Sequence, residues 1–213
     1  MTKLPFELPD LNAPTPSPQC ASDDVKSFIA TRRSTPIKTF DAEAPGPSGE
    51  ELENMLAAAM RVPDHRRLGP WRAIIVRQES RETLGAHLAR RFKDLNPEAS
   101  EQEVEIERQR LLRAPVSVII VSSPKDDGKT PVWEQELSAG ALCMNLLYVT
   151  HACGYAGSWL TEWWAFDAEI NTVLGLSETE RIAGNVFIGQ SKVSLFERPR
   201  PSTSERISVW SDR

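Results

Sequence analysis

The chain has 213 residues, of which 40% are hydrophobic, so it is long enough for one domain with a substantial core. Its net charge of −5 at pH 7 argues against a nucleic-acid-binding protein, which normally carries a basic surplus. No apolar run approaches the length of a membrane span, and the N-terminus lacks the pattern of a secretory signal. Three cysteines are too few for a disulfide framework, which favours a reducing compartment, the cytoplasm.

A proline-rich stretch opens the chain over residues 1–22 and shows little periodicity. We expect it to be a flexible or wrapping arm, with a single domain over residues 23–213. A first helix is capped by Ser22 or Asp23 and ends near Arg32. The segment that follows, as far as residue 40, is expected to be extended.

A capping box marks the start of the second helix, because Ser48 is followed three residues later by Glu51. Apolar residues then recur at helical spacing until Pro63 stops the helix. The pattern beyond it predicts, in chain order, a strand over 71–77, a helix over 80–92, a solvated helix over 101–113, a central strand over 115–122, a core helix over 133–153, a loop over 157–161, a short helix over 167–174, a strand over 185–189 and a terminal strand near 207–209.

Helices outnumber strands in this pattern, and the two do not alternate strictly. The sequence therefore predicts an α+β fold in which a small mixed or antiparallel central sheet is packed by helices. There is no Gly-x-Gly-x-x-Gly after a strand and no Walker-type loop, so a dinucleotide-binding domain is not supported. The three histidines, at positions 65, 87 and 151, have no metal-ligand spacing, so no metal site is expected.

Three short sequence segments carry functional groups that would suit different parts of one ligand. Arg32-Arg33-Ser34 supplies two cations and a hydroxyl, which suit a phosphate. Pro63-Asp64-His65 is a rigid loop between a helix and a strand, and 157–161 is an aromatic segment after the core helix. Together the three segments could hold a ligand with a phosphate at one end and a flat amphipathic ring at the other. Flavin mononucleotide (FMN) has this shape and charge distribution.

The order of these strings resembles the nitroreductase family of FMN-dependent oxidoreductases, in its compact single-domain form. No single piece is diagnostic, but the ordered set is fairly specific and covers roughly residues 25–210. The matching pieces are Phe28-x-x-x-Arg32-Arg33-Ser34, Leu52-x-x-Met55-Leu56-x-Ala58-Ala59, Arg61-Val62-Pro63-Asp64-His65, Pro70-Trp71-Arg72, Ser138-Ala139-Gly140, Gly154-Tyr155-Ala156-Gly157-Ser158-Trp159, Ile188-Gly189 and Arg198-Pro199-Arg200.

The resemblance implies a domain-swapped homodimer with two FMN sites at the subunit interface. The 133–153 helix would lie in the dimer core, and a C-terminal strand containing Ile207 and Val209 would join the partner's sheet. The resemblance also assigns the cofactor-binding residues: Arg32, Arg33 and Ser34 on the phosphate and ribityl chain, Arg61 and His65 reaching the partner's flavin, Trp159, Leu160 and Thr161 along the ring, and Arg198 and Arg200 completing the phosphate cradle.

Each assignment has a plainer alternative. The Arg32–Arg33 pair can be a basic helix C-terminus that interacts with the helix dipole. His65 can be a surface-loop histidine, and residues 159–161 can simply return the chain to the sheet. The arginines at 198 and 200 can form a solvated basic turn.

Pro36 departs from the family pattern. Many relatives carry a lysine two residues after the serine, near the pyrimidine edge of the flavin, and Pro36 stands in that place. The cation that stabilises reduced flavin must then come from elsewhere, for which Arg33, Arg72 and a backbone dipole are candidates.

The resemblance implies an NAD(P)H-dependent reductase. Hydride would pass to flavin N5, and a small electron acceptor such as a nitroaromatic or a quinone would then be reduced in the same pocket by ping-pong turnover. Because the flavin performs the chemistry, no catalytic acid–base side chain is expected. Two alternatives are a flavin-fragmenting or dehalogenating relative and a non-catalytic FMN-binding or sequestering protein.

Overall fold

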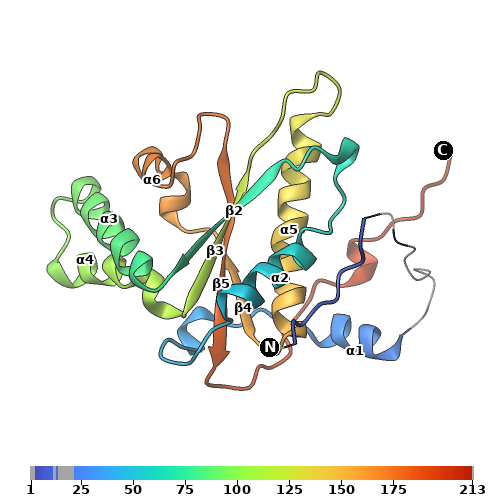
Figure 1. Ribbon diagram of the computed structural model, residues 1–213, viewed down its shortest axis with the longest axis horizontal. Helices are drawn as coiled ribbons and strands as arrows, with labels where there is room; N and C mark the ends of the chain where they lie inside the picture. The colour runs from blue at the N-terminus through green and yellow to red at the C-terminus, as the bar shows by residue number, and fades with distance from the viewer. Residues whose placement is uncertain (1–2, 12, 14–21, 213) are drawn as a thin grey trace.

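A five-stranded antiparallel sheet lies at the centre of the computed structural model, which describes residues 3–11, 13 and 22–212 (Figure 1). The hydrogen-bonded order is β1-β5-β3-β2, and β4 also pairs with β5. The strands are β1 (Phe40–Asp41), β2 (Trp71–Arg77), β3 (Val116–Ser122), β4 (Ala156–Leu160) and β5 (Arg181–Ser191). The expected α+β class and antiparallel sheet are confirmed.

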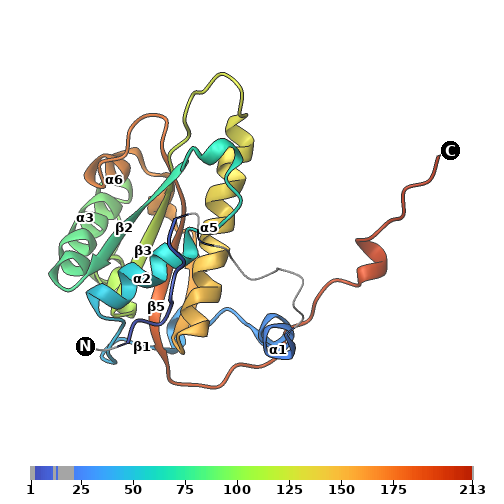
Figure 2. The same cartoon turned by 45° about the vertical axis from the view of Figure 1, so that its right-hand side comes forward.

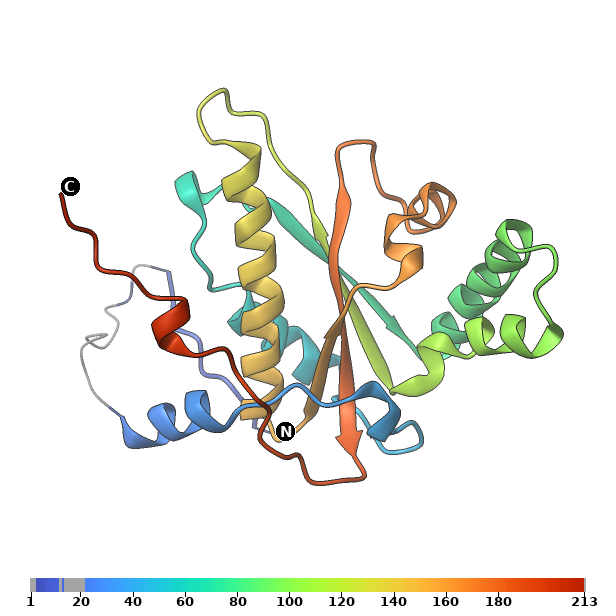
Figure 3. The ribbon, with the colours of Figure 1, turned by 180° about the vertical axis from the view of Figure 1, so that it is seen from behind.

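Helices cover both faces of the sheet. Figure 1 shows α2 and α5 on one side and α3, α4 and α6 on the other, and Figure 3 shows the same layers from behind. None of the helices in the described part of the chain is long and apolar enough to cross a bilayer. The helices are α1 (Asp23–Thr31), α2 (Gly49–Ala59), α3 (Glu79–Leu95), α4 (Glu101–Arg108), α5 (Val132–Ala152) and α6 (Ala168–Val173).

The central strand β3 contributes side chains to both hydrophobic cores, one on each face of the sheet. Alternate side chains of a strand point to opposite faces, so Val118 and Ile120 enter the core beneath α2 and α5, whereas Ile119 and Val121 enter the core beneath α3. All seven residues of β3 are buried. The nearly continuous apolar run that predicted a central strand therefore reflects burial on both faces.

Local signals fix the ends of several helices as the sequence indicated. Ser48 and Glu51 form both hydrogen bonds of a capping box at the start of α2. Gly154 follows α5 with φ +80°, and Gly175 follows α6 with φ +69°, a conformation that favours glycine. The predicted helix over 133–153 and strand over 71–77 agree with α5 and β2.

Three local predictions were wrong or incomplete. The expected loop over 157–161 is largely strand β4, because it pairs with β5 from Ala156 to Leu160. The solvated helix expected over 101–113 ends at Arg108 and continues as a 3-10 helix, and Glu107 on it is buried. The segment before β1 contains a 3-10 turn at Ile37–Thr39 rather than a fully extended chain.

The two ends of the chain behave differently. In the N-terminal arm, Phe6 exchanges two 2.9 Å hydrogen bonds with the Asn54 side chain on α2, which holds this part of the arm on the domain. Residues 14–21 of the predicted arm lie outside the described residues. The C-terminal arm, residues 192–212, first contacts the segment after α1 through Glu197 and Arg198 and then extends away from the domain (Figure 2). Its Ile207 and Val209 are exposed and pair with no strand of the described chain.

The ion pair between Arg72 on β2 and Glu180, which directly precedes β5, predicts how the stability of the fold depends on pH. The Arg72 side chain donates to Glu180 at 2.8 and 3.0 Å and lowers the pKa of that carboxyl to about 2. A glutamate in an unfolded chain titrates near about 4.3, so the pair stabilises the fold above that pH and is lost as the pH falls toward 2. We expect Glu180→Gln to lower the melting temperature at pH 7, and this difference from the wild type to shrink on acidification.

The matched control is Glu178→Gln, which removes the same charge from an exposed position that has no ion pair among the described residues. Thermal unfolding of the three proteins at a series of pH values measures the effect. A melting-temperature difference for Glu180→Gln that is the same at pH 7 and at about pH 2 would contradict the assignment.

Candidate functional site

A backbone hydrogen bond brings the Arg32-Arg33-Ser34 segment to the sheet. The helix α1 ends at Thr31, and the chain then runs beside β4, where the Thr35 N–H donates to the Gly157 carbonyl at 3.0 Å. This contact places both arginines next to the last turn of α5. The basic segment that follows α1 therefore also lies along the outer edge of β4.

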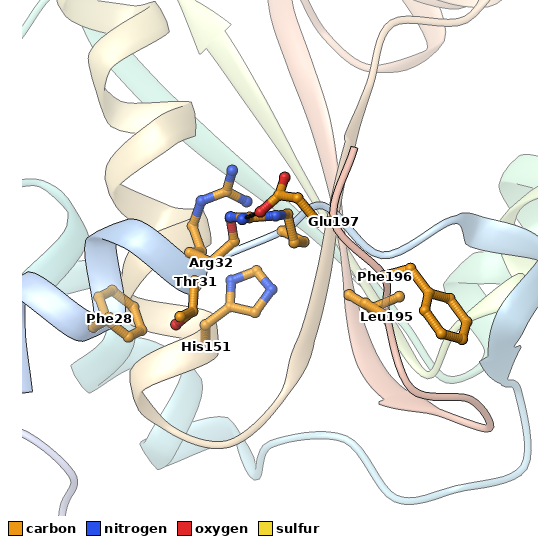
Figure 4. Close-up of a pocket in the computed structure, with 8 residues that line it drawn as sticks. Phe28, Thr31, Arg32, His151, Leu195, Phe196 and Glu197 are labelled. Carbon is orange, nitrogen blue, oxygen red and sulfur yellow. Dashed lines mark hydrogen bonds and ion pairs between the residues drawn. The ribbon is translucent and has the colours of Figure 1, made fainter. Parts of the chain in front are cut away.

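A cavity of about 350 Å³ lies at this junction. Three of the seven buried side-chain polar atoms that lack a hydrogen-bond partner within the described residues belong to residues that line it: Arg32 Nη1, Arg33 Nε and His151 Nε2. Figure 4 shows the His151 ring and the Glu197 carboxylate near Arg32, with Phe28 and Phe196 at opposite sides. Unpartnered buried polar groups cost free energy, and two of these three are guanidinium donors that carry positive charge, so the cavity indicates an anionic ligand.

The C-terminal arm closes this cavity on one side. Glu197 forms an ion pair with Arg33, whose guanidinium also donates to the carbonyls of Ala30 and Arg32 at 2.8 Å. Arg198 reaches the Ser34 carbonyl at 3.3 Å, where a second cavity of about 390 Å³ begins. Four predicted residues, Arg32, Arg33, Ser34 and Arg198, therefore lie together. Arg200 is exposed on the same arm and takes part in no ion pair with the described residues.

His151 is a site residue that sequence reasoning missed. Its Nδ1 lies 2.6 Å from the Leu147 carbonyl, which can only accept, so Nδ1 carries the proton and Nε2 does not in the neutral ring. Burial lowers the pKa of His151, and the charge of Arg32 acts in the same direction against the opposing hydrogen bond to Leu147. In the sequence this histidine was considered as a metal ligand, for which it lacks the spacing.

Strand β4 carries the aromatic segment away from the arginines. Gly157 and Leu160 are separated by about 10 Å along a strand. The Gly157 carbonyl faces Thr35 rather than β5, so the backbone of Trp159, two residues later, also faces the outer edge. The Trp159 side chain lies over Gly184, where a Cβ would collide with the indole. Leu160 packs into the core beneath α3, and Thr161 is exposed.

A buried network of charges supports the chain just beyond β4. Glu162 accepts hydrogen bonds from Arg110 at 2.7 Å and from Arg113 at 2.9 Å. Arg110 also pairs with Glu107, which accepts from the Trp163 indole at 2.8 Å. The Glu107–Arg110 pair at i,i+3 was expected to be solvated, but it anchors the turn after β4. The network fixes the position of residues 160–163.

The loop after α2 lies elsewhere. His65 Nδ1 is 2.8 Å from Glu134 in the first turn of α5, and Arg61 is exposed. Asp64 caps the loop by accepting from Leu68 N–H at 3.0 Å and from Gly69 N–H at 2.8 Å.

The two groups of predicted residues lie at opposite ends of α5. Glu134 is in its first turn and His151 in its last, about 25 Å apart at the helical rise of about 1.5 Å per residue. The structure therefore brings Arg32 and Arg33 together with His151, and it separates His65 from them within one chain.

Two other expectations concern ions. Arg72, one candidate for the cation that replaces the family lysine, is bound to Glu180 and to the Gly175 carbonyl, so it is not free for this role. Within the described ranges, no group of three or more histidine, cysteine, aspartate or glutamate side chains could hold a metal ion.

The family model "Nitroreductase family" matches residues 29–190, so the chain belongs to this family. It is 30% identical to the Escherichia coli protein named "Putative NAD(P)H nitroreductase YdjA" over 145 residues, which cover 68% of this chain and 78% of that protein.

Solved structures show the same fold. A nitroreductase-like protein from Bacillus cereus superimposes with a TM-score of 0.72 at 18% identity, over 90% of this chain and 98% of that one. A nitroreductase with bound FMN from Bacteroides fragilis superimposes with a TM-score of 0.63 at 18% identity, over 89% of this chain and all of that one (100%).

Proposed function

We propose that this protein is an FMN-dependent oxidoreductase that takes hydride from NAD(P)H and reduces a small acceptor such as a nitroaromatic or a quinone. The observation that carries the proposal is that three residues lining one cavity, Arg32, Arg33 and His151, each have a buried nitrogen without a hydrogen-bond partner among the described residues. Family membership and the FMN named in the B. fragilis structure support the choice of anion.

The residues at the cavity fit the phosphate of FMN. Arg32 and Arg33 provide guanidinium donors, which suit a phosphate better than a point charge does. Arg33 is paired with Glu197, so a phosphate that enters exchanges one anionic partner for another. Ser34, Arg198 and Arg200 are proposed to contact the phosphate and the ribityl chain.

The ring is proposed to lie along the outer edge of β4, next to Trp159, Leu160 and Thr161. The outward-facing Trp159 N–H is a fixed donor for the polar edge of the flavin, and such hydrogen bonds tune its electron affinity. When bound, FMN supplies the capacity to accept hydride from NAD(P)H and pass electrons on. This chain is proposed to bind and orient the FMN. Because Pro36 replaces the family lysine, a backbone N–H donor is proposed to stabilise the reduced flavin in its place.

A homodimer completes the proposal. α5 exposes Trp133 (67%) and Leu137 (53%), a large apolar surface on a helix that otherwise enters the core. A two-fold axis across the middle of α5 would place His65 and Arg61 of one copy beside the Arg32 cavity of the other. The extended C-terminal arm, with its exposed Val209, is proposed to join the second copy as a strand. Free Cys143 and Cys153 support a reducing compartment, the cytoplasm.

The function is tested with the purified protein and added FMN. A flavin absorbance near about 450 nm that co-elutes with the protein, together with oxidation of NADH or NADPH on addition of a nitroaromatic or quinone, supports the reductase. Bound flavin that neither nicotinamide reduces would favour the sequestering alternative. Conversion of the flavin itself to smaller products would favour the flavin-fragmenting one.

Arg32→Ala is expected to weaken FMN binding by about 10- to 100-fold, because a charged hydrogen bond is worth roughly 1.5 to 3 kcal/mol. Lys26→Ala is the matched control: it removes one positive charge from exposed α1 without lining the cavity. Flavin fluorescence titration measures both affinities. Equal affinity of the two variants for FMN would argue against a phosphate at Arg32.

Leu137→Glu is expected to shift the protein toward monomer, because it places a charge on the exposed apolar face of α5. Ile106→Glu is the matched control, since Ile106 on α4 is similarly exposed (57%) but lies on the opposite side of the sheet. Sedimentation velocity at equal concentrations distinguishes the two. If both variants form dimers as stable as those of the wild type, the exposed face of α5 is not the dimer interface.

A further inference from the structure

We propose that His151 is a proton-dependent ligand of the cofactor phosphate, so that binding of FMN takes up a proton. In the free protein the ring is neutral, and with phosphate present Nε2 becomes protonated and donates to it. This inference rests on the proposed function, because it requires that the phosphate of FMN enters the cavity beside α5.

The geometry fixes which ring nitrogen faces the ligand. Nδ1 donates to the Leu147 carbonyl at 2.6 Å, which holds the ring in one orientation. Nε2 is then the ring nitrogen without a partner, and the His151 side chain lines the same cavity as Arg32 and Arg33. Protonation of Nε2 creates a donor there and leaves the bond to Leu147 intact.

The charges around His151 favour a neutral ring without the ligand. The charged groups that line its cavity are Arg32 and Arg33, which follow α1, and Glu197 on the C-terminal arm. β4 packs against the ring at Gly157, which carries no charge. Burial is the main cause that lowers the pKa of His151, and the charge of Arg32 adds to it, because Glu197 is paired with Arg33 rather than with Arg32; the hydrogen bond to Leu147 opposes both.

A bound phosphate would replace the positive electrostatic potential at the His151 ring with a negative one. Its second pKa is about 6, so above about pH 6.5 it is mainly a dianion and its own titration no longer changes the affinity. Two negative charges within hydrogen-bond reach of Nε2 favour the imidazolium, and the backbone carbonyl of Arg33 also favours the charged form. Since the complex then holds one more proton than the free protein, FMN affinity must fall as the pH rises.

The experiment measures the dissociation constant of FMN from flavin-free protein between about pH 6.5 and pH 8.5, with riboflavin as the ligand that lacks the phosphate. We expect FMN to bind more weakly with rising pH, by up to about tenfold per pH unit, and riboflavin to show no such trend. Calorimetry in buffers of different ionisation enthalpy should show uptake of about one proton with FMN.

His151→Gln provides a neutral donor near the position of Nε2, and we expect its FMN affinity to be independent of pH. His151→Asn retains a donor for Leu147 without Nε2 and serves if the first variant does not fold. His87→Gln, on α3 outside this cavity, is expected to retain the wild-type pH dependence.

The outcomes separate this inference from the proposed function. FMN that binds more tightly than riboflavin, but with no pH dependence and no proton uptake in the wild type, overturns the role of His151 and leaves the phosphate site in place. A pH dependence that persists unchanged in His151→Gln also overturns it. Failure of both flavins to bind at any pH overturns the proposed function itself.

Discussion

The hydrogen bond between Thr35 and Gly157 is the constraint on which the arrangement of the site depends. It attaches the segment that follows α1 to the first residues of β4, and so sets the distance between the arginines and the last turn of α5. Among the described residues it occupies the outer edge of β4 at Gly157 and leaves that edge open at Trp159. β4 thus connects the neighbourhood of the arginines with the aromatic segment at Trp159.

Much of the fold could be predicted from local sequence patterns. The continuous apolar run of β3, the capping box at Ser48 and the long pattern of α5 are signals carried by neighbouring residues, and each is found in the structure. β4 was missed because its small residues, Gly157 and Ser158, have a low intrinsic strand preference. It is a strand because β5 pairs with it, and such pairing partners cannot be read from one segment alone.

The site was predictable to the extent that it is local. Arg32, Arg33 and Ser34 adjoin one another in the chain, and the resemblance pointed to the same segment. His151 and Glu197 enter the cavity through contacts that join distant parts of the chain, which no spacing in the sequence indicates. Glu107 was misread for a related reason, since an i,i+3 pair looks the same whether it faces water or, as here, a tryptophan across the domain.

The charges at the two ends of the site differ in their contact with solvent ions. At the aromatic end, Arg110 and Glu162 are largely enclosed, with side chains only 18% and 11% exposed. At the cationic end, the Glu197 side chain is 61% exposed. Dissolved salt screens exposed charges over about 8 Å at physiological ionic strength and enclosed ones much less. The contact of the C-terminal arm with Arg33 therefore varies with the ionic medium, whereas the support beneath residues 160–163 varies much less.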